Sequence, residues 1–356
     1  MAKQKKPRGS TSTSTSTSTT TTTTRLSPPP NGQHLLDVFQ QAFGPLLAAD
    51  DLTALVQEAK AALFARDFAR AFSRPDLLAA YAARWSPTRA ACYARVLARV
   101  ERFLGWGDSN NDDNDVNNNN NNNNNDSDVN NNNNRLRVVA FGGATAELAA
   151  LSAFLPGQRW KTSTISLVDL APWQTALAPL YTALTTPLPP TAYVPSPRPP
   201  LSPASELSYT FTQTDALSLA TDSNLSTALN LGSATLVTIL FTLNELFSSA
   251  VGGVGRTTAF LLALTDALRP GTVLLVIDSP GSYAETAIGP AGAKRRYPVA
   301  WLLDHVLLTR AGPGRWEKLL GEESAWFRWG GDSAASWRYA IALEDMRFQM
   351  HVYRAL

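Results

Sequence analysis

Apolar and polar positions divide the second half of the chain into short strand-like runs and longer helical segments. The predicted strands are residues 136–141, 165–168, 209–212, 236–241, 273–277 and 347–354. Apolar residues recur at helical spacing in 146–154, 172–184 and 257–268. Repeated strand–helix–strand units predict an α/β fold, in which helices cover both faces of a mainly parallel sheet.

The first half of the chain has a different pattern. Residues 35–105 show helical spacing throughout, so we predict a helical N-terminal domain there. Within it, Ser86 followed by Pro87 is typical of a helix start. Residues 1–34 form a basic tail rich in Ser and Thr, and residues 106–134 are mostly Asn with some Asp. Both segments lack apolar surface, so we predict that they are disordered and that a second domain spans 135–356.

Composition narrows the possible functions. The 356 residues carry 31 basic and 29 acidic side chains, and this near balance says little about a polyanionic partner. One cysteine excludes an intramolecular disulfide, and with three histidines it argues against a metal cluster. The start of the sequence lacks the apolar core of a signal peptide, and no apolar run approaches the length of a membrane span. We therefore expect no metal and no membrane contact.

Polar or small residues follow the first three strands of the predicted sheet. Gly142, Gly143 and Ala144 follow the first strand directly and permit a tight turn into a helix N-terminus. Asp169 ends the second strand, where nucleotide-binding folds keep an acidic residue for ribose hydroxyls. Thr214 and Asp215 follow the third strand, where a carboxylate could accept a hydrogen bond from an adenine amine. The three strand ends together predict an adenosine pocket.

The next two strands also end in polar residues. Asn244 and Glu245 follow the fourth strand, and Asp278 follows the fifth. Parallel strands are apolar along their length, so these side chains are expected to face the site, although helix or turn capping is the alternative. The segment "SPGSYAE" is not the GxSxG turn of a serine hydrolase.

The most conspicuous glycine segment is "AVGGVGRTT" at 250–258. A phosphate-binding loop follows its strand at once, whereas "TLNELFSSA" separates these glycines from the preceding strand. Arg256 also stands where such a loop carries lysine. We therefore predict a surface loop that leads into a helix near Thr257.

Several longer segments resemble one family. "RWSPTRAACY", "LFTLNELF", "LLVIDSPGSYAE", "YPVAWLLDHVLL" and the closing "LEDMRFQMHVYR" are similar to the fungal large-subunit ribosomal RNA uridine-N3-methyltransferases. The resemblance covers most of 136–356 and reaches into the helical block. It implies a Rossmann-like class I methyltransferase sheet that uses S-adenosylmethionine.

The resemblance also implies roles for the strand-end residues. Gly142 and Gly143 would approach the methionine part of the cofactor, with Asp169 at the ribose and Thr214 and Asp215 at the adenine. Asn244 and Glu245 would lie near the transferable methyl group. Phe141 stands where the family has an acidic residue, so recognition of the methionine ammonium must differ.

Transfer to N3 of uracil requires a base that removes a proton, and Asp278 is preferred over Glu245. Because N3 lies on the Watson–Crick edge, the nucleotide must be unpaired or flipped out. Tyr283 and Trp301 are candidates for stacking on it, with core packing as the alternative for both.

Cationic residues outside the predicted cofactor site are candidates for RNA contact: Arg84, Arg89 and Arg95 on a helix, and Lys294, Arg295 and Arg296 on a Gly/Pro-rich loop interpreted as a lid. For the helix, an ordinary charged flank is the alternative. The expected partner is large-subunit ribosomal RNA or a pre-ribosome, and the expected location is the nucleus or nucleolus, with the cytoplasm as the alternative. We expect a monomer.

Two other classes of function stay open at the level of sequence. One is a non-catalytic RNA-binding or ribosome-assembly factor with a degenerate methyltransferase fold, because the "FGGATAE" turn is a weak motif. The other is an NAD-dependent dehydrogenase, against which the missing GxGxxG and the Thr214–Asp215 edge argue.

Overall fold

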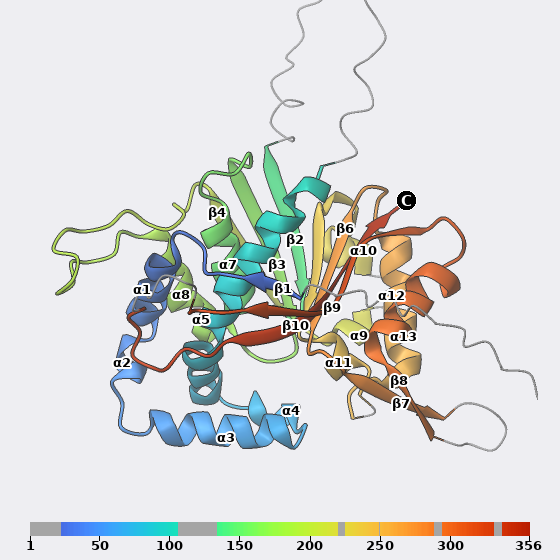
Figure 1. Ribbon diagram of the computed structural model, residues 1–356, viewed down its shortest axis with the longest axis horizontal. Coiled ribbons are helices and arrows are strands. Elements are labelled where there is room, and N and C mark those ends of the chain that lie inside the picture. The colour runs from blue at the N-terminus through green and yellow to red at the C-terminus, as the bar shows by residue number, and fades with distance from the viewer. Residues whose placement is uncertain (1–22, 106–133, 220–224, 249, 288–293, 331–336) are drawn as a thin grey trace, which may run out of the picture.

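An eight-stranded sheet is the main element of the computed structural model, which describes residues 23–105, 134–219, 225–248, 250–287, 294–330 and 337–356 (Figure 1). The strand order is β1-β9-β10-β6-β5-β2-β3-β4. The strands are β1 (Thr24–Leu26), β2 (Arg135–Phe141), β3 (Thr162–Asp169), β4 (Leu207–Gln213), β5 (Leu236–Leu240), β6 (Val273–Asp278), β9 (Trp316–Phe327) and β10 (Met346–Ala355). A separate hairpin pairs β7 (Tyr283–Ala287) with β8 (Lys294–Pro298).

The five neighbouring strands β4, β3, β2, β5 and β6 run parallel to one another. Strand β10 is antiparallel to both of its neighbours, β6 and β9. The chain builds outward from β2 through β3 to β4, and then returns to the other side of β2 with β5 and β6. The order therefore reverses between β2 and β5, which is where open α/β sheets bind ligands at the carboxyl ends of their strands. The predicted α/β fold is confirmed.

Helices cover both faces of this sheet (Figure 1). Side chains alternate along β2, so that Val138 packs with one face and Val139 with the other. The helices are α1 (Gly32–Ala42), α2 (Gly44–Leu47), α3 (Leu52–Phe64), α4 (Phe68–Ala71), α5 (Pro75–Val100), α7 (Thr145–Phe154), α8 (Gln174–Thr185), α9 (Ala216–Leu219), α10 (Leu225–Leu229), α11 (Leu243–Leu246), α12 (Gly253–Ala267) and α13 (Val299–His305), with short turns η1 (Glu101–Phe103), η2 (Leu231–Ser233) and η3 (Val306–Arg310).

The N-terminal helices share a core with the sheet. Tyr93 and Val96 of α5 are buried in the same apolar cluster as Leu148 of α7 and Val138 of β2. Residues 1–22 and 106–133, which contain most of the predicted disorder, lie outside the described residues. In contrast to that prediction, Thr24–Leu26 pairs with β9 as the edge strand β1.

The predicted helix start at Ser86 is wrong, because α5 begins at Pro75 and runs through Pro87 without a break. A proline inside a helix leaves the carbonyl four residues earlier without its usual N–H donor. That carbonyl belongs to Ala83, and the Tyr339 hydroxyl donates to it at 2.7 Å. A residue distant in sequence therefore makes the continuous helix possible.

Three further expectations change in the structure. The polar strand β9 was not predicted, and the segment 279–298, which was expected to be a flexible lid, contains the β7–β8 hairpin. Helix α12 begins at Gly253, a turn earlier than predicted, and the Ser248 carbonyl accepts from the Gly252 and Gly253 N–H groups. The glycines of "AVGGVGRTT" thus belong mainly to a helix start.

Candidate active site

A cleft of about 760 Å³ opens at the carboxyl ends of the parallel strands, on the side where α3 and α4 lie (Figure 1). This volume lies within the range of small-molecule sites. Its lining comes from the strand ends (Phe141, Gly142, Val168 to Pro172, Gln213 to Ala216, Thr242, Glu245 and Leu246), from the α3–α4 region (Arg66 to Ala69, Phe72 and Ser73) and from Ala250 and Val251. The cleft therefore lies where the strand order predicts it.

The glycine turn after β2 is shaped by a neighbouring strand end. Gly142 has a φ of +67°, and a Cβ built on it would overlap the Thr242 side chain. A Cβ on Gly143 would come within 2.7 Å of the Ala140 Cβ. Gly142 lines the cleft, whereas Gly143 packs against protein atoms. Gly142 is thus needed so that β2 and β5 can end side by side, and Gly143 is needed so that the turn can pack against Ala140 and Glu147.

The residues predicted to bind adenosine lie together at the ends of β3 and β4 in the cleft. The Asp169 carboxylate accepts from the Ala171 N–H at 2.7 Å, and burial raises its pKa to about 6 against that hydrogen bond. Thr214 and Asp215 line the cleft as predicted. However, the Asp215 carboxylate caps the following turn at the Leu217 N–H and pairs with Arg256 at 2.9 Å. Asp215 is therefore already partnered by protein groups.

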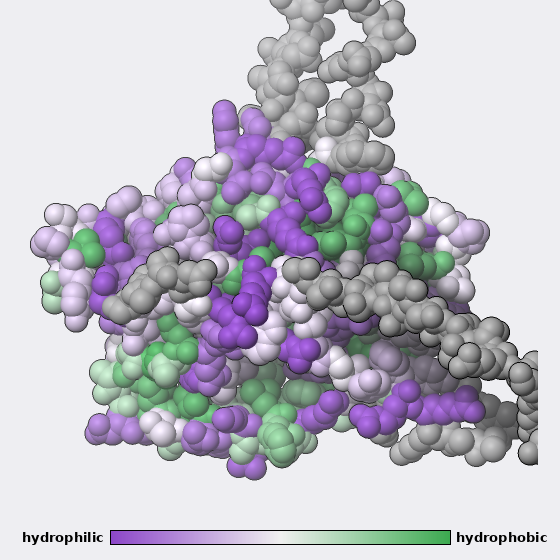
Figure 2. Space-filling model, viewed as in Figure 1, coloured by the Kyte–Doolittle hydropathy of each residue, from purple (hydrophilic) through white to green (hydrophobic). Residues whose placement is uncertain are grey.

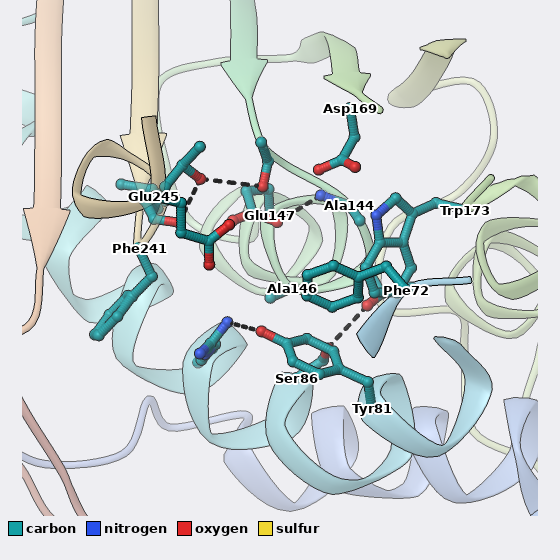
Figure 3. A pocket seen from close by; sticks show the side chains of 15 residues that line it. Phe72, Tyr81, Ser86, Ala144, Ala146, Glu147, Asp169, Trp173, Phe241 and Glu245 are labelled. Carbon is teal, nitrogen blue, oxygen red and sulfur yellow. Dashed lines mark hydrogen bonds between the residues drawn. The ribbon is translucent and has the colours of Figure 1, made fainter. Parts of the chain in front are cut away.

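A smaller recess adjoins the cleft and shares Gly142, Asp169 and Glu245 with it (Figure 3). Its wall includes Arg89 of α5, which the sequence assigned to an RNA-contacting surface. The Arg89 guanidinium donates to the Tyr81 hydroxyl and lies 4.9 Å from the centre of the Phe241 ring. The side chain is directed into the site, so it is not part of an outer basic face.

Three carboxylates surround the recess, namely those of Asp169, Glu147 and Glu245 (Figure 3). Glu147 accepts from the Ala144 N–H at 2.8 Å, and burial raises its pKa to about 7 although that bond and Arg89 oppose the shift. Burial raises the pKa of Glu245 to about 8; Arg89 and Arg66 oppose this, and Asp169 and Asp278 add to it. The recess thus has carboxyl groups that change charge near neutral pH.

Asp278 is bonded differently from Glu245. Its carboxylate accepts from the Asn244 N–H at 2.8 Å, from the Asn244 side-chain amide at 2.5 Å and from the Ser279 N–H at 2.7 Å. Burial raises the Asp278 pKa against these hydrogen bonds. Neither Asp278 nor Asn244 lines the cleft or the recess. The pair holds α11 at the end of β6, and α11 in turn carries Glu245.

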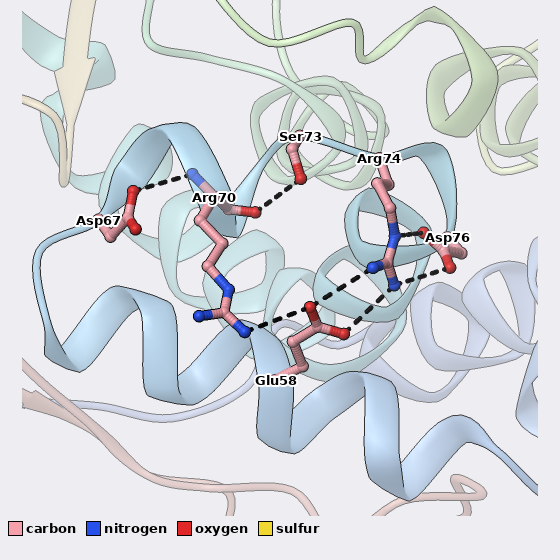
Figure 4. A network of polar contacts seen from close by, with 6 residues as sticks. All are labelled: Glu58, Asp67, Arg70, Ser73, Arg74 and Asp76. Atoms are coloured by element: carbon pink, nitrogen blue, oxygen red, sulfur yellow. Dashed lines mark hydrogen bonds and ion pairs between the residues drawn. The ribbon is translucent and has the colours of Figure 1, made fainter.

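Polar contacts hold the helical wall of the cleft (Figure 4). Glu58 of α3 pairs with Arg70 at 3.7 Å and with Arg74 at 3.2 Å, and Arg74 also pairs with Asp76. The Asp67 carboxylate caps α4 at the Arg70 N–H. Exposed ion pairs each contribute little to stability, so this network mainly fixes the geometry of the α3–α5 connection.

The other candidate RNA-contacting residues are spread over the surface. Arg84 pairs with Glu344, and Arg95 is half-buried on α5. The β7–β8 hairpin carries Lys294, Arg295 and Arg296, and Figure 2 shows a hydrophilic surface at its lower right, over this hairpin. Trp301 is stacked on the Tyr297 and His305 rings at 5.2 and 5.1 Å, and Tyr283 lies under Arg296 at 5.1 Å. Both aromatic side chains are nearly half exposed.

Sequence reasoning missed Glu147, Tyr81 and Phe241 as site residues. In the sequence, Glu147 is indistinguishable from an ordinary acidic residue in a first helical turn. Tyr81 fits the apolar face of a helix. Phe241 closes the apolar run of β5, but its φ of +58° takes it out of the strand and turns its ring toward Arg89. Only the close spacing of Arg89 and the aromatic residues in "YAARWSPTR" hinted at this arrangement.

The described residues hold no group of three or more His, Cys, Asp and Glu side chains that could bind a metal ion. Among the same residues, no helix is both long and apolar enough to cross a bilayer. The site is instead a cleft with the Asp169 carboxylate at the end of β3 and a charged recess beside a glycine turn. These features fit a nucleoside linked to a zwitterionic group.

Family comparison agrees with this class of site. The model of a family described as "Putative SAM-dependent methyltransferase" matches residues 39–354. The chain therefore belongs to this family of S-adenosylmethionine-dependent methyltransferases, and the resemblance seen in its sequence motifs is confirmed at that level. This membership favours an enzyme over a non-catalytic factor and over an NAD-dependent dehydrogenase.

Individual relatives can also be described. A 25S rRNA (uridine(2843)-N(3))-methyltransferase of Saccharomyces cerevisiae is 27% identical over 352 residues, which cover 90% of this chain and 85% of that protein. An O-methyltransferase family protein from Burkholderia thailandensis is 12% identical with a TM-score of 0.36, covering 86% of this chain and 73% of its own. A SAM-dependent methyltransferase from Methanosarcina mazei is 10% identical with a TM-score of 0.34, and the match covers 63% of this chain and 93% of that one.

The Gly142→Ala variant tests the packing of the glycine turn. It adds left-handed strain and a clash with Thr242, so we expect it to lower the free energy of unfolding by about 2–4 kcal/mol in urea denaturation. Gly157→Ala is the matched control, because Gly157 also has a positive φ but no atom within 4 Å of an added Cβ. We expect it to cost about 1–2 kcal/mol. Equal losses in the two variants would contradict the proposed contact.

Proposed function

We propose that this chain transfers a methyl group to N3 of a uridine in large-subunit ribosomal RNA. The observation that carries the proposal is a half-buried carboxylate, Glu245, facing a nucleoside-sized cleft in a chain of the methyltransferase family. The relative from Saccharomyces cerevisiae, which aligns along most of both chains, supports the choice of RNA and of ring nitrogen.

The residues of the cleft fit the cofactor in one orientation. The Asp169 carboxylate accepts from the Ala171 N–H and lines the cleft at the end of β3, where its remaining acceptor capacity suits ribose hydroxyls. Gln213 and Thr214 line the cleft farther from the glycine turn, on the adenine side. When bound, S-adenosylmethionine supplies an electrophilic methyl group. The chain's own task is then to present the uracil ring to that group and to remove its N3 proton.

Glu245 replaces Asp278 as the proposed base. Both Asp278 oxygens accept hydrogen bonds from Asn244 or Ser279, whereas the Glu245 carboxylate borders both the cleft and the recess. The Glu245 carboxylate would take up the N3 proton, and N3 would then accept the methyl group that the bound cofactor would supply, with S-adenosylhomocysteine as the leaving group. Asp278 keeps a positioning role, because it anchors Asn244 next to Glu245.

The RNA is proposed to approach along the carboxyl edge of the sheet. The β7–β8 hairpin follows β6 at this edge, and Arg295 and Arg296 have exposed side chains that suit phosphate contact. N3 lies on the pairing edge of the base, so the target uridine has to leave any helix before it reaches the cleft. We further propose that the chain acts as a monomer. We also propose that it acts in the nucleus or nucleolus, and the basic residues between 3 and 8 support this location.

Removal of the base tests this mechanism. Glu245→Gln keeps the shape of the side chain but cannot take a proton, so we expect kcat to fall by roughly 10²–10⁴. Because the carboxylate form is required and its pKa is raised to about 8, the wild-type rate should rise with pH up to about that value. Arg89 on α5, Asp169 on β3, Asp278 on β6 and Arg66 all act on this pKa. Methyl transfer to an RNA fragment, measured from pH 6.5 to 9, checks both expectations.

Glu206→Gln is the matched control, since Glu206 is exposed at the amino end of β4. It should retain the wild-type rate and pH profile. Wild-type turnover in Glu245→Gln, together with a complete loss in Asp278→Asn, would transfer the role of base to Asp278.

The choice of substrate is tested in cells. We expect large-subunit ribosomal RNA from cells that lack this protein to lose N3-methyluridine at one position, and a plasmid copy should restore it. Nucleoside mass spectrometry followed by mapping of the site measures this loss. An unchanged N3-methyluridine content in the deleted strain would refute the proposed substrate.

A further inference from the structure

Arg89 is the cation of the recess beside the glycine turn. It borders Gly142, Ala144 and Glu147 in the lining of this recess. Among the described residues, no carboxylate lies within ion-pair distance of its guanidinium, whose assigned contacts are the Tyr81 hydroxyl and two aromatic rings. A guanidinium has five N–H donors, so most of its hydrogen-bonding capacity remains open toward the recess.

Two features hold Arg89 in this position. Phe241 has a φ of +58°, a conformation that is costly for a bulky residue, and its ring centre lies 4.9 Å from the guanidinium. Helix α5 is fixed on the N-terminal side of Arg89, where the Tyr339 hydroxyl donates to the Ala83 carbonyl and the Trp329 indole donates to the adjacent Thr88 at 2.9 Å. Left-handed residues are found preferentially at ligand sites, which agrees with this position.

The opposite side of the recess is the first turn of α7. The N–H groups of such a turn and a nearby arginine together favour an anionic group. Glu147 uses one carboxylate oxygen for the Ala144 N–H, so its second oxygen is free for a cation. The recess therefore offers a binding site for a negative group and one for a positive group within the same small space.

We propose that Arg89 binds the carboxylate, and Glu147 the ammonium, at the amino-acid end of the cofactor. This inference rests on S-adenosylmethionine as the cofactor but not on the identity of the RNA. A phosphate would meet the Asp169 carboxylate with like charge, whereas a zwitterion offers one group to Arg89 and one to the carboxyl side of the recess. The assignment also explains how an ammonium is recognised in a chain with Phe141 in place of the family's acidic residue.

The experiment compares two cofactor products in the absence of RNA. S-adenosylhomocysteine carries the amino-acid end, whereas 5′-methylthioadenosine lacks it. For Arg89→Met we expect affinity for S-adenosylhomocysteine to fall by roughly 10- to 100-fold, since a charged hydrogen-bonded pair is lost. Affinity for 5′-methylthioadenosine should change by less than about threefold. Glu147→Gln should show the same selectivity with a fall of about tenfold. Calorimetry measures all of these constants.

Arg102→Met is the matched control, because Arg102 is exposed on η1, just beyond α5. It should leave both affinities unchanged. If Arg89→Met does not fold, the wild-type chain still decides the question: the decarboxylated analogue of S-adenosylhomocysteine should bind roughly 10- to 100-fold more weakly than the parent. Equal losses for both ligands, or an unchanged affinity for S-adenosylhomocysteine, would overturn the proposal. An unchanged affinity for S-adenosylhomocysteine together with a raised KM for RNA would indicate that Arg89 contacts the target nucleobase instead.

Discussion

Burial of several carboxylates at one end of a sheet is unfavourable unless a cation lies among them, and α5 brings Arg89 to Asp169, Glu147 and Glu245 for this purpose. Each of these carboxyl groups has a raised pKa because burial disfavours its charged form. Arg89 opposes the shift at Glu147 and Glu245. The chemistry of the site therefore depends on the position of one guanidinium.

That position depends in turn on distant parts of the chain. The segment between β9 and β10 supplies Tyr339 and Trp329, which hold α5 in the turns that lead up to Arg89. Gly142 after β2 lets Thr242 approach, and this sets the spacing between the β2 and β5 ends. The Asp278–Asn244 pair then anchors α11, so that Glu245 reaches the same recess. Ion pairing, side-chain packing and backbone conformation thus together position the residues of the recess, at the place where the strand order reverses.

The sequence predicted the fold where local pattern decides structure. The five parallel strands are short runs of apolar or alternating residues, and the polar residues at their ends, among them Asp169, Thr214 and Glu245, line the cleft. The pattern failed where distant contacts override local signals. Pro87 indicated a helix boundary, but the Tyr339 hydroxyl compensates for the missing N–H and the helix continues. Strand β9 was missed because its polar residues face solvent at the edge region of the sheet and lack a clear apolar run.

The roles within the site were harder to predict for the same reason. Arg89 stands at the flank of an amphipathic helix in sequence, and only the packing of α5 against α7 shows that this flank faces the cleft. Asp278 and Glu245 are equivalent strand-end carboxylates in the sequence. Their difference comes from the Asn244 and Ser279 donors that occupy Asp278.

A crystal structure of the chain with S-adenosylhomocysteine tests the central claim most directly. The account predicts adenine near Thr214, ribose hydroxyls on Asp169, and the amino-acid end between Arg89 and the first turn of α7, with the sulfur facing Glu245. A ligand whose amino-acid end points away from Arg89, or whose ribose lies elsewhere than at Asp169, would contradict it.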